Sequence, residues 1–158
     1  KAREFDVPTR FIELAGEINT KMPQVVVAKT GQALSLVSQK ALNGSSVLMI
    51  GMAYKKNIDD MRESPSLVLT ELLEAEGADV AFHDPFVPVI PHTREHDELA
   101  GRKSIDLNPE TISGFDITLI STDHDGIEYQ MLADHAKIIV DTRNAMKGLS
   151  GRAIVVKA

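Results

Sequence analysis

The first part of the chain carries apolar residues at helical spacing. Between residues 8 and 42 they recur every third or fourth position, which gathers them on one face of an α-helix. They are Phe11, Leu14, Ala15, Ile18, Met22, Val26, Leu34, Val37 and Leu42. Pro23 has no amide hydrogen, so the helix is expected either to kink there or to restart with Pro23 in its first turn. Asn43-Gly44 then supplies a left-handed stop.

After residue 44 the pattern changes to short apolar runs rich in β-branched residues. Because each run is short and continuously apolar, it is typical of a strand buried on both faces of a parallel sheet. The expected strands are 46–50, 79–83, 116–121, 137–140 and 153–156. Helices are expected over 66–76, ending at Gly77, and over 128–135. Residues 86–109 read as a polar, proline-containing loop with some helix.

This order of elements predicts an α/β fold: a Rossmann-like, doubly wound parallel sheet with helices on both faces, preceded by a long helix that is kinked or interrupted at Pro23. We expect residues 1–42 to be a helical segment that connects to a central domain, and 43–158 to form the α/β domain. A simple packed helical pair is the alternative to a connecting strut. The chain opens on Lys1 rather than Met, so it is expected to be a piece of a longer protein.

Composition narrows the classes of function. Hydrophobic residues make up 43% of the 158 residues and charged residues 25%, the ordinary balance of a globular domain. The net charge of −6 argues against a general nucleic-acid surface, which needs clustered Lys and Arg. No apolar run is long enough to span a membrane. The chain contains no cysteine, which excludes disulfides, thiolate zinc sites and cysteine nucleophiles within it.

The densest chemical signal is the segment 51–65, GMAYKKNIDDMRESP, between the first expected strand and the helix that follows it. Ligands of open parallel sheets gather outside the carboxyl ends of the strands, so this loop is well placed for binding. Lys55, Lys56 and Arg62 suit a phosphate. Gly51-x-Ala53 is only a remnant of the dinucleotide fingerprint, since no third glycine follows. The alternative is a solvated basic loop with a tight glycine turn.

The same segment resembles the G-x-A-[FY]-K-x-x-x-x-D-x-R-E-S-P signature of the UDP-glucose/GDP-mannose dehydrogenase family, and it matches every fixed position. Further resemblances follow in family order along the chain: Ile18-Asn19 with Met22-Pro23, His83-Asp84-Pro85, and Val140-Asp141-Thr142-Arg143-Asn144. The opening residues 11–19 resemble the branch that oxidises UDP-N-acetylhexosamines, particularly UDP-N-acetylglucosamine, rather than UDP-glucose.

The resemblance assigns roles to four residues. Tyr54 and Lys55 are expected to line the nucleotide-sugar pocket, and Arg143 to contact the UDP part of the substrate. Arg62 is expected to reach an NAD cofactor that is held mainly by an N-terminal domain. These roles suit the side chains, because a lysine is a compact cation and an arginine fork can bind a pyrophosphate through two bonds. The alternative for Arg143 is an ion pair with Asp141 or another carboxylate.

Other polar residues are expected to be structural. Asp59 and Asp60 are expected to cap a helix or pair with Arg62, and Asp84 to form a turn with Pro85. Ser121 to His124 contain Ser, His and Asp, but closeness in sequence is no evidence of a triad. The remaining candidates are histidines read as polar loop residues rather than metal ligands, so no metal site is expected: His83, His92, His96 and His124.

The resemblance therefore implies the substrate-binding part of an NAD-dependent UDP-sugar 6-dehydrogenase. The full-length enzyme would oxidise the C6 alcohol to a carboxylate with two NAD, in the cytoplasm and for polysaccharide biosynthesis, as a homodimer or higher oligomer. The family's nucleophilic cysteine lies upstream, so this chain should hold no catalytic residue and be inactive alone. The alternatives are a stand-alone nucleotide-binding or regulatory α/β module, and an architectural domain that helps a long helix dimerise.

Overall fold

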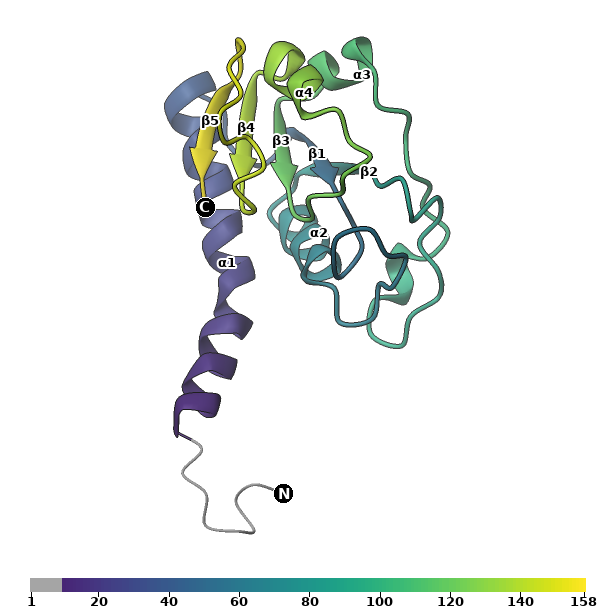
Figure 1. Cartoon of the computed structure of the whole chain (residues 1–158). Coiled ribbons are helices and arrows are strands. Elements are labelled where there is room, and N and C mark those ends of the chain that lie inside the picture. Colours follow the sequence, from purple (N-terminus) through teal and green to yellow (C-terminus); the bar gives the residue numbers. More distant parts are fainter. Residues whose placement is uncertain (1–9) are drawn as a thin grey trace, which may run out of the picture.

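The computed structural model describes residues 10–158 and builds a parallel sheet flanked by helices, with one long helix beside it (Figure 1). The elements along the chain are α1 (Arg10–Ser38), β1 (Ser46–Ile50), α2 (Pro65–Ala75), β2 (Asp79–His83), the short 3-10 helix η2 (Asp97–Leu99), α3 (Pro109–Gly114), β3 (Ile117–Ile120), α4 (Tyr129–His135), β4 (Ile138–Asp141) and β5 (Ile154–Lys157). All the expected strands are present with bounds shifted by no more than a residue or so.

The sheet has the strand order β2-β1-β3-β4-β5, and every neighbouring pair is parallel. In the register, Ile50 lies opposite His83 on one side and Ile120 on the other. The chain moves outward from β1 to β2 and then returns to the other side of β1. This reversal between β1 and β3 is the switch point at which open α/β sheets bind ligands.

Alternate residues of the strands feed two hydrophobic cores. Val47 and Met49 of β1 point into the core that α1 and α2 cover. Leu48 and Ile50 point into the core that α3 and α4 cover. Since the side chains of a strand alternate between its faces, continuously apolar strands require cover on both sides. The prediction of helices on both faces is confirmed.

α1 runs as one continuous helix through Pro23, so it does not restart there. The sequence prediction of its end was wrong: the helix stops at Ser38 because Gln39 takes a left-handed conformation with φ 53°, ahead of Asn43-Gly44. Only the C-terminal half of α1 packs on the sheet, while its N-terminal half projects beyond the domain (Figure 1). Phe11 there is 82% exposed. The division at residue 42 stays a prediction, and residues 1–9 lie outside the described part.

Capping residues explain where α2 begins and ends and where α3 begins. Ser64 caps α2 by accepting a bond from the amide of Ser66, and Pro65 occupies the first turn, as predicted. Gly77, with φ 86°, ends the helix. α3 was not predicted; its cap is Asn108, whose side chain accepts from Thr111 N. No helix within residues 10–158 is long and apolar enough to cross a membrane.

Candidate functional site

The loop after β1 begins with a glycine that no other residue can replace without strain. Gly51 has φ 83°, and a Cβ atom added there would lie 2.3 Å from the carbonyl oxygen of Thr122. Glycine is therefore required both for the left-handed backbone and for the close approach of the β3 loop. This contact brings the loops that follow β1 and β3 together at the carboxyl edge of the sheet.

Asp84, directly after β2, fixes the start of the same loop. Its carboxylate is buried, and Oδ2 accepts bonds from the amides of Met52 at 2.6 Å and Ala53 at 2.9 Å. Its Oδ1 accepts from the amides of Phe86 and Val87, which is the turn that the sequence predicted. The larger role of Asp84 was missed. Because these loop amides bind Asp84, they are not available to cradle a phosphate, unlike those of a dinucleotide-binding loop.

His124 was expected to be a polar loop residue, and this was wrong, because its side chain is fully buried. Its Nδ1 accepts a bond from the amide of Asn57 at 2.9 Å, and its Nε2 lies 3.0 Å from Asp84 Oδ2. An amide donor at Nδ1 requires that nitrogen to be unprotonated, so the ring hydrogen sits on Nε2 and is donated to Asp84. The burial of Tyr129, whose hydroxyl donates to the carbonyl of His124, raises the pKa of that hydroxyl.

A cavity of about 690 Å³ opens at the carboxyl ends of β1, β3 and β4, where α1 forms one wall. It brings together two of the predicted substrate residues, Tyr54 and Arg143. The other lining residues come from α1, the N-terminal end of α2 and the strand ends: Asn19, Thr20, Met22, Pro23, Val26, Glu63, Pro65, Val68, Leu69, Ser121, Thr142 and Ala158. The resemblance motifs in α1 and after β4 therefore meet in space.

Arg143 is held by its Nε, which donates to the carbonyl oxygen of Ser121 at 2.5 Å. The expected alternative, a side-chain ion pair with Asp141, is not what the structure has. Asp141 is buried and accepts from the backbone amides of Arg143, Ala145 and Met146 instead. Within residues 10–158 the two terminal amino groups of Arg143 have no hydrogen-bond or ion-pair partner. They are free to bind an anion in the cavity.

Lys55 follows Tyr54 in the chain but is not one of the described residues that line this cavity. Its Nζ is 5.2 Å from the centre of the Tyr54 ring, which is within the range of a cation–π contact. The Tyr54 side chain is half-exposed at the cavity, and its backbone amide donates to the carbonyl of Asp60 at 2.8 Å. The two predicted residues therefore form one exposed pair on the β1 loop, with Tyr54 toward the cavity.

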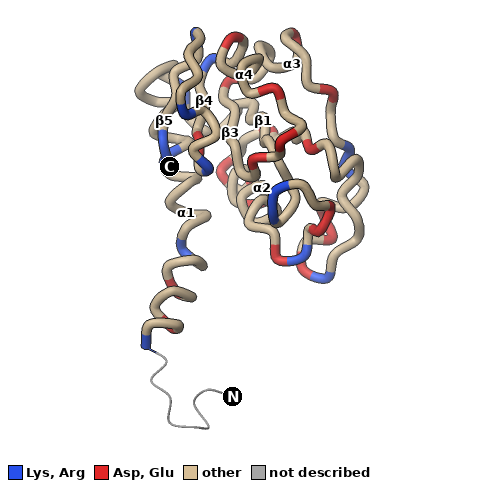
Figure 2. The backbone as a smooth tube through the Cα atoms, viewed as in Figure 1, with Lys and Arg blue, Asp and Glu red and all other residues tan. Residues whose placement is uncertain are grey.

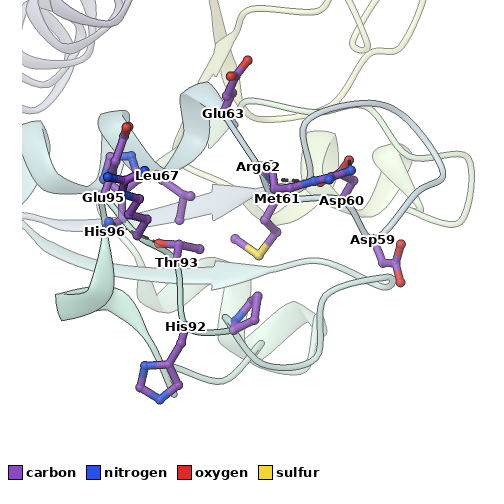
Figure 3. Close-up of a pocket in the computed structure, with 12 residues that line it drawn as sticks. Asp59, Asp60, Met61, Arg62, Glu63, Leu67, His92, Thr93, Glu95 and His96 are labelled. Atoms are coloured by element: carbon purple, nitrogen blue, oxygen red, sulfur yellow. Dashed lines mark hydrogen bonds and ion pairs between the residues drawn. The ribbon is translucent and has the colours of Figure 1, made fainter.

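Arg62 belongs to a second cavity of about 720 Å³, between residues 59–63 and the segment 91–96 (Figure 3). Its side chain turns toward Asp60, with Nε 3.0 Å from Oδ1 and a terminal nitrogen 2.8 Å from Oδ2. This pair, which the sequence predicted, lowers the pKa of Asp60 to about 2. Arg62 is 87% exposed, so the pair leaves it accessible. Glu63, with φ 58°, lines both cavities.

The charges around this edge are mixed. Figure 2 shows Lys and Arg interspersed with Asp and Glu along the loops rather than joined in a continuous basic stripe. Lys56 pairs with Asp125 at 2.5 Å and lies outside the first cavity, which Arg143 lines as the one cation among residues 10–158. In the described part of the chain no group of three or more His, Asp or Glu side chains could hold a metal ion.

Proteins of known activity share this domain. The chain is 28% identical over 146 residues to UDP-N-acetyl-D-mannosamine dehydrogenase of Methanococcus maripaludis, covering 87% of this chain and 31% of that protein. It is 27% identical over 152 residues to a UDP-glucose 6-dehydrogenase of Bacillus subtilis, covering 85% of this chain and 33% of that protein. The chain thus spans about a third of the length of these relatives.

Solved structures of related enzymes contain a domain with the same fold. UDP-N-acetyl-mannosamine dehydrogenase of Pyrococcus horikoshii superposes with a TM-score of 0.72 at 25% identity, over 97% of this chain and 35% of that one. The Cap5O enzyme of the same activity from Staphylococcus aureus gives 0.70 at 26% identity, over 94% and 33%. The UDP binding domain of the UDP-glucose/GDP-mannose dehydrogenase family matches residues 48–148. This match covers most of the chain, including the loops after β1, β2 and β3 and the first part of the loop after β4, and the chain therefore belongs to that family as its C-terminal, UDP binding domain.

Proposed function

We propose that this chain binds the UDP part of a UDP-sugar for an NAD-dependent 6-dehydrogenase. The observation that carries the proposal is the meeting of Tyr54 and Arg143 in one cavity at the switch point of the sheet. The terminal amino groups of Arg143, which have no partner within residues 10–158, form a planar fork that suits a pyrophosphate. Pro65 brings the N-terminal end of α2, which carries partial positive charge, to the same cavity. Glu63 opposes these two attractions.

The aromatic ring and the lysine of the β1 loop complete the substrate side. Tyr54 offers an aromatic face to the sugar or the base, and Lys55 beside it offers a cation to phosphate or sugar oxygens. An N-acetylhexosamine is the proposed sugar, since two relatives of this chain are UDP-N-acetyl-mannosamine dehydrogenases. The resemblance of residues 11–19 to the UDP-N-acetylglucosamine branch favours the gluco epimer.

We also propose that Arg62 contacts the NAD cofactor. Arg62 is exposed in a cavity of its own and suits one contact to an anionic cofactor. The loop amides of Met52 and Ala53 bind Asp84, so the main hold on NAD must come from another part of the enzyme. When bound, NAD would supply the oxidising chemistry for both oxidations at the C6 carbon, and Arg62 would be this chain's contact to it. This chain holds no cysteine, so the covalent step of the family needs a thiol from outside it.

We further propose that the full-length enzyme acts in the cytoplasm, in polysaccharide biosynthesis, as a homodimer or higher oligomer.

The test is UDP-sugar affinity in the complete protein for wild type, Lys55→Ala, Arg143→Ala and the double variant. A hydrogen bond to a charged group contributes about 1.5 to 3 kcal/mol, so each single change should weaken binding by roughly 10- to 150-fold. If both cations contact one ligand, the double variant should depart from additivity. Lys147→Ala, an exposed cation outside the cavity lining, is the control and should have no effect. Near-wild-type affinity in both single variants would rule out the site.

A further inference from the structure

The tip of the β1 loop is fastened to the loop after β3 by contacts that the proposed function does not use. The side-chain amide of Asn57 donates to Asp125 Oδ2 at 2.7 Å, and the backbone amide of Asp125 donates back to Asn57 Oδ1 at 3.0 Å. Lys56 adds an ion pair with Asp125 at 2.5 Å. We call these residues, together with His124, the loop clasp: Lys56, Asn57, His124 and Asp125.

The buried end of the loop clasp is the imidazole of His124. It accepts the backbone amide of Asn57 on one side and donates to Asp84 on the other. The ring of Phe86 lies against it, with the two centroids 5.0 Å apart. Asp84 in turn binds the amide of Ala53. Two buried side chains, Asp84 and His124, thus link the start of the β1 loop to its tip.

Tyr54 and Lys55 lie between these two fixed points. On the near side, the carbonyl of Ala53 also accepts a bond from the Thr122 hydroxyl at 2.7 Å. On the far side, Asn57 adopts φ 60°, a left-handed conformation that asparagine tolerates better than most residues. Lys56 pairs with Asp125, whereas Lys55 lies over the Tyr54 ring. The residues assigned to the substrate are therefore the ones that the loop clasp spans.

We propose that Asn57 and His124 are positioning residues, which hold Tyr54 and Lys55 at the mouth of the cavity before a UDP-sugar arrives. The proposal rests on the proposed function, because it takes the 690 Å³ cavity as the UDP-sugar site. A loop that is ordered only on binding costs conformational entropy, and this cost lowers affinity. A preformed loop avoids the cost. Loss of the contacts at Asn57 should therefore weaken substrate binding and leave the unfolding temperature nearly unchanged, whereas loss of the buried bond between His124 and Asp84 should lower the unfolding temperature.

The first variant turns the attractive side-chain contact between Asn57 and Asp125 into a repulsive one. In the complete protein, Asn57→Asp sets two carboxylates against each other and removes the amide donor, without disturbing buried groups, since Asn57 is exposed. Affinity for UDP and for UDP-N-acetylglucosamine, measured by titration calorimetry, should fall by roughly 10-fold. Adding Asp125→Asn to this variant restores an amide–carboxylate pair with exchanged roles, and most of the affinity should return.

The second pair of variants separates the two bonds of the histidine. His124→Gln can still reach Asp84 with its amide but gives up the acceptor for Asn57, so it should lose affinity by roughly 3- to 10-fold with little change in unfolding temperature. His124→Asn keeps an acceptor near the position of Nδ1 and gives up the bond to Asp84. It should lose unfolding temperature more than affinity.

The control is Gln130→Ala, which breaks an exposed bond between helix α4 and the loop before β5, from Gln130 to the carbonyl of Ser150 at 2.8 Å. It should bind as wild type does. Failure of the wild type to bind either ligand would overturn the proposed function itself. Binding by the wild type together with equal binding by Asn57→Asp and His124→Gln would overturn the loop clasp alone. So would affinity losses that merely follow losses of stability and are not restored by Asp125→Asn.

Discussion

Gly51 is the residue on which the approach of the β1 and β3 loops depends. With φ 83° and a prospective Cβ only 2.3 Å from the carbonyl oxygen of Thr122, Gly51→Ala introduces both backbone strain and a clash with main chain. We expect a loss of about 2 to 3 kcal/mol in the free energy of unfolding, measured in urea.

Gly126→Ala is the matched control for this loss. Gly126 lies in the neighbouring loop, and nothing stands within 4 Å of an added Cβ there. Its effect should stay within about 0.5 kcal/mol. Similar urea midpoints for the two variants would contradict the close approach at Gly51.

The ion pair between Asp60 and Arg62 should be visible in the ionisation of Asp60 at low pH. Hydrogen bonds from Arg62 lower the pKa of Asp60 from 3.8 to about 2. A depressed folded-state pKa means that the carboxylate's contribution is complete above the unfolded value and is lost as the pH falls from about 4 through 2. Carboxyl NMR should therefore find a larger protonated fraction of Asp60 at pH 3 in Arg62→Ala, which loses the side-chain bonds, than in the wild type. Identical titrations would mean that the pair does not form in solution.

Among the elements, α2 depends on one buried hydroxyl at its start. Ser64 accepts from the amide of Ser66 and donates to the carbonyl of Met52 at 2.7 Å. Ser64→Ala removes the cap and leaves a buried carbonyl without its donor, so unfolding should become easier by about 1 to 3 kcal/mol. Ser113→Ala, at an exposed hydroxyl in α3, should change the thermal midpoint little. A cap loss no larger than this control would refute the role of Ser64.

The sequence predicted those helices and strands that both the apolar pattern and the residues at their ends indicate. The strands could be found because continuous apolar runs mark burial on both faces, and α2 because Ser64-Pro65 and Gly77 mark its ends. α3 was missed because its six residues are too few to display a helical period. The end of α1 was missed because Gln39 adopts a left-handed conformation that its side chain does not favour. Tertiary context decides such a residue.

The candidate site was predictable to a similar extent. Resemblance named Tyr54 and Arg143, and the shared edge of parallel strand ends explains why they meet. Nothing local distinguishes His124 from an ordinary loop histidine. Its burial follows from a partner 40 positions away, Asp84, and that pairing depends on the registers of three neighbouring strands. Such a contact follows from the tertiary fold and has no signature in the sequence pattern.

At the scale of the whole molecule, two cavities lie on either side of Glu63, which lines both. One holds Tyr54 and Arg143, and the other holds Arg62. This division supports the proposal of separate substrate and cofactor approaches to one edge of the sheet. The projecting half of α1, with Phe11 largely exposed, supports the prediction that this segment connects to a further domain.

The last prediction is that the 158-residue chain alone binds UDP but forms no NADH with UDP-N-acetylglucosamine, UDP-N-acetylmannosamine or UDP-glucose. The chain has no cysteine to carry the covalent step, and the amides of Met52 and Ala53 are bound to Asp84 rather than open to a dinucleotide. The measurement is NADH absorbance, with UDP titration of the same sample to establish that the site is folded. NADH formation that Arg143→Ala abolishes would mean that the chemistry resides in this domain after all. With UDP bound and no NADH formed, the chemistry must instead depend on residues outside it.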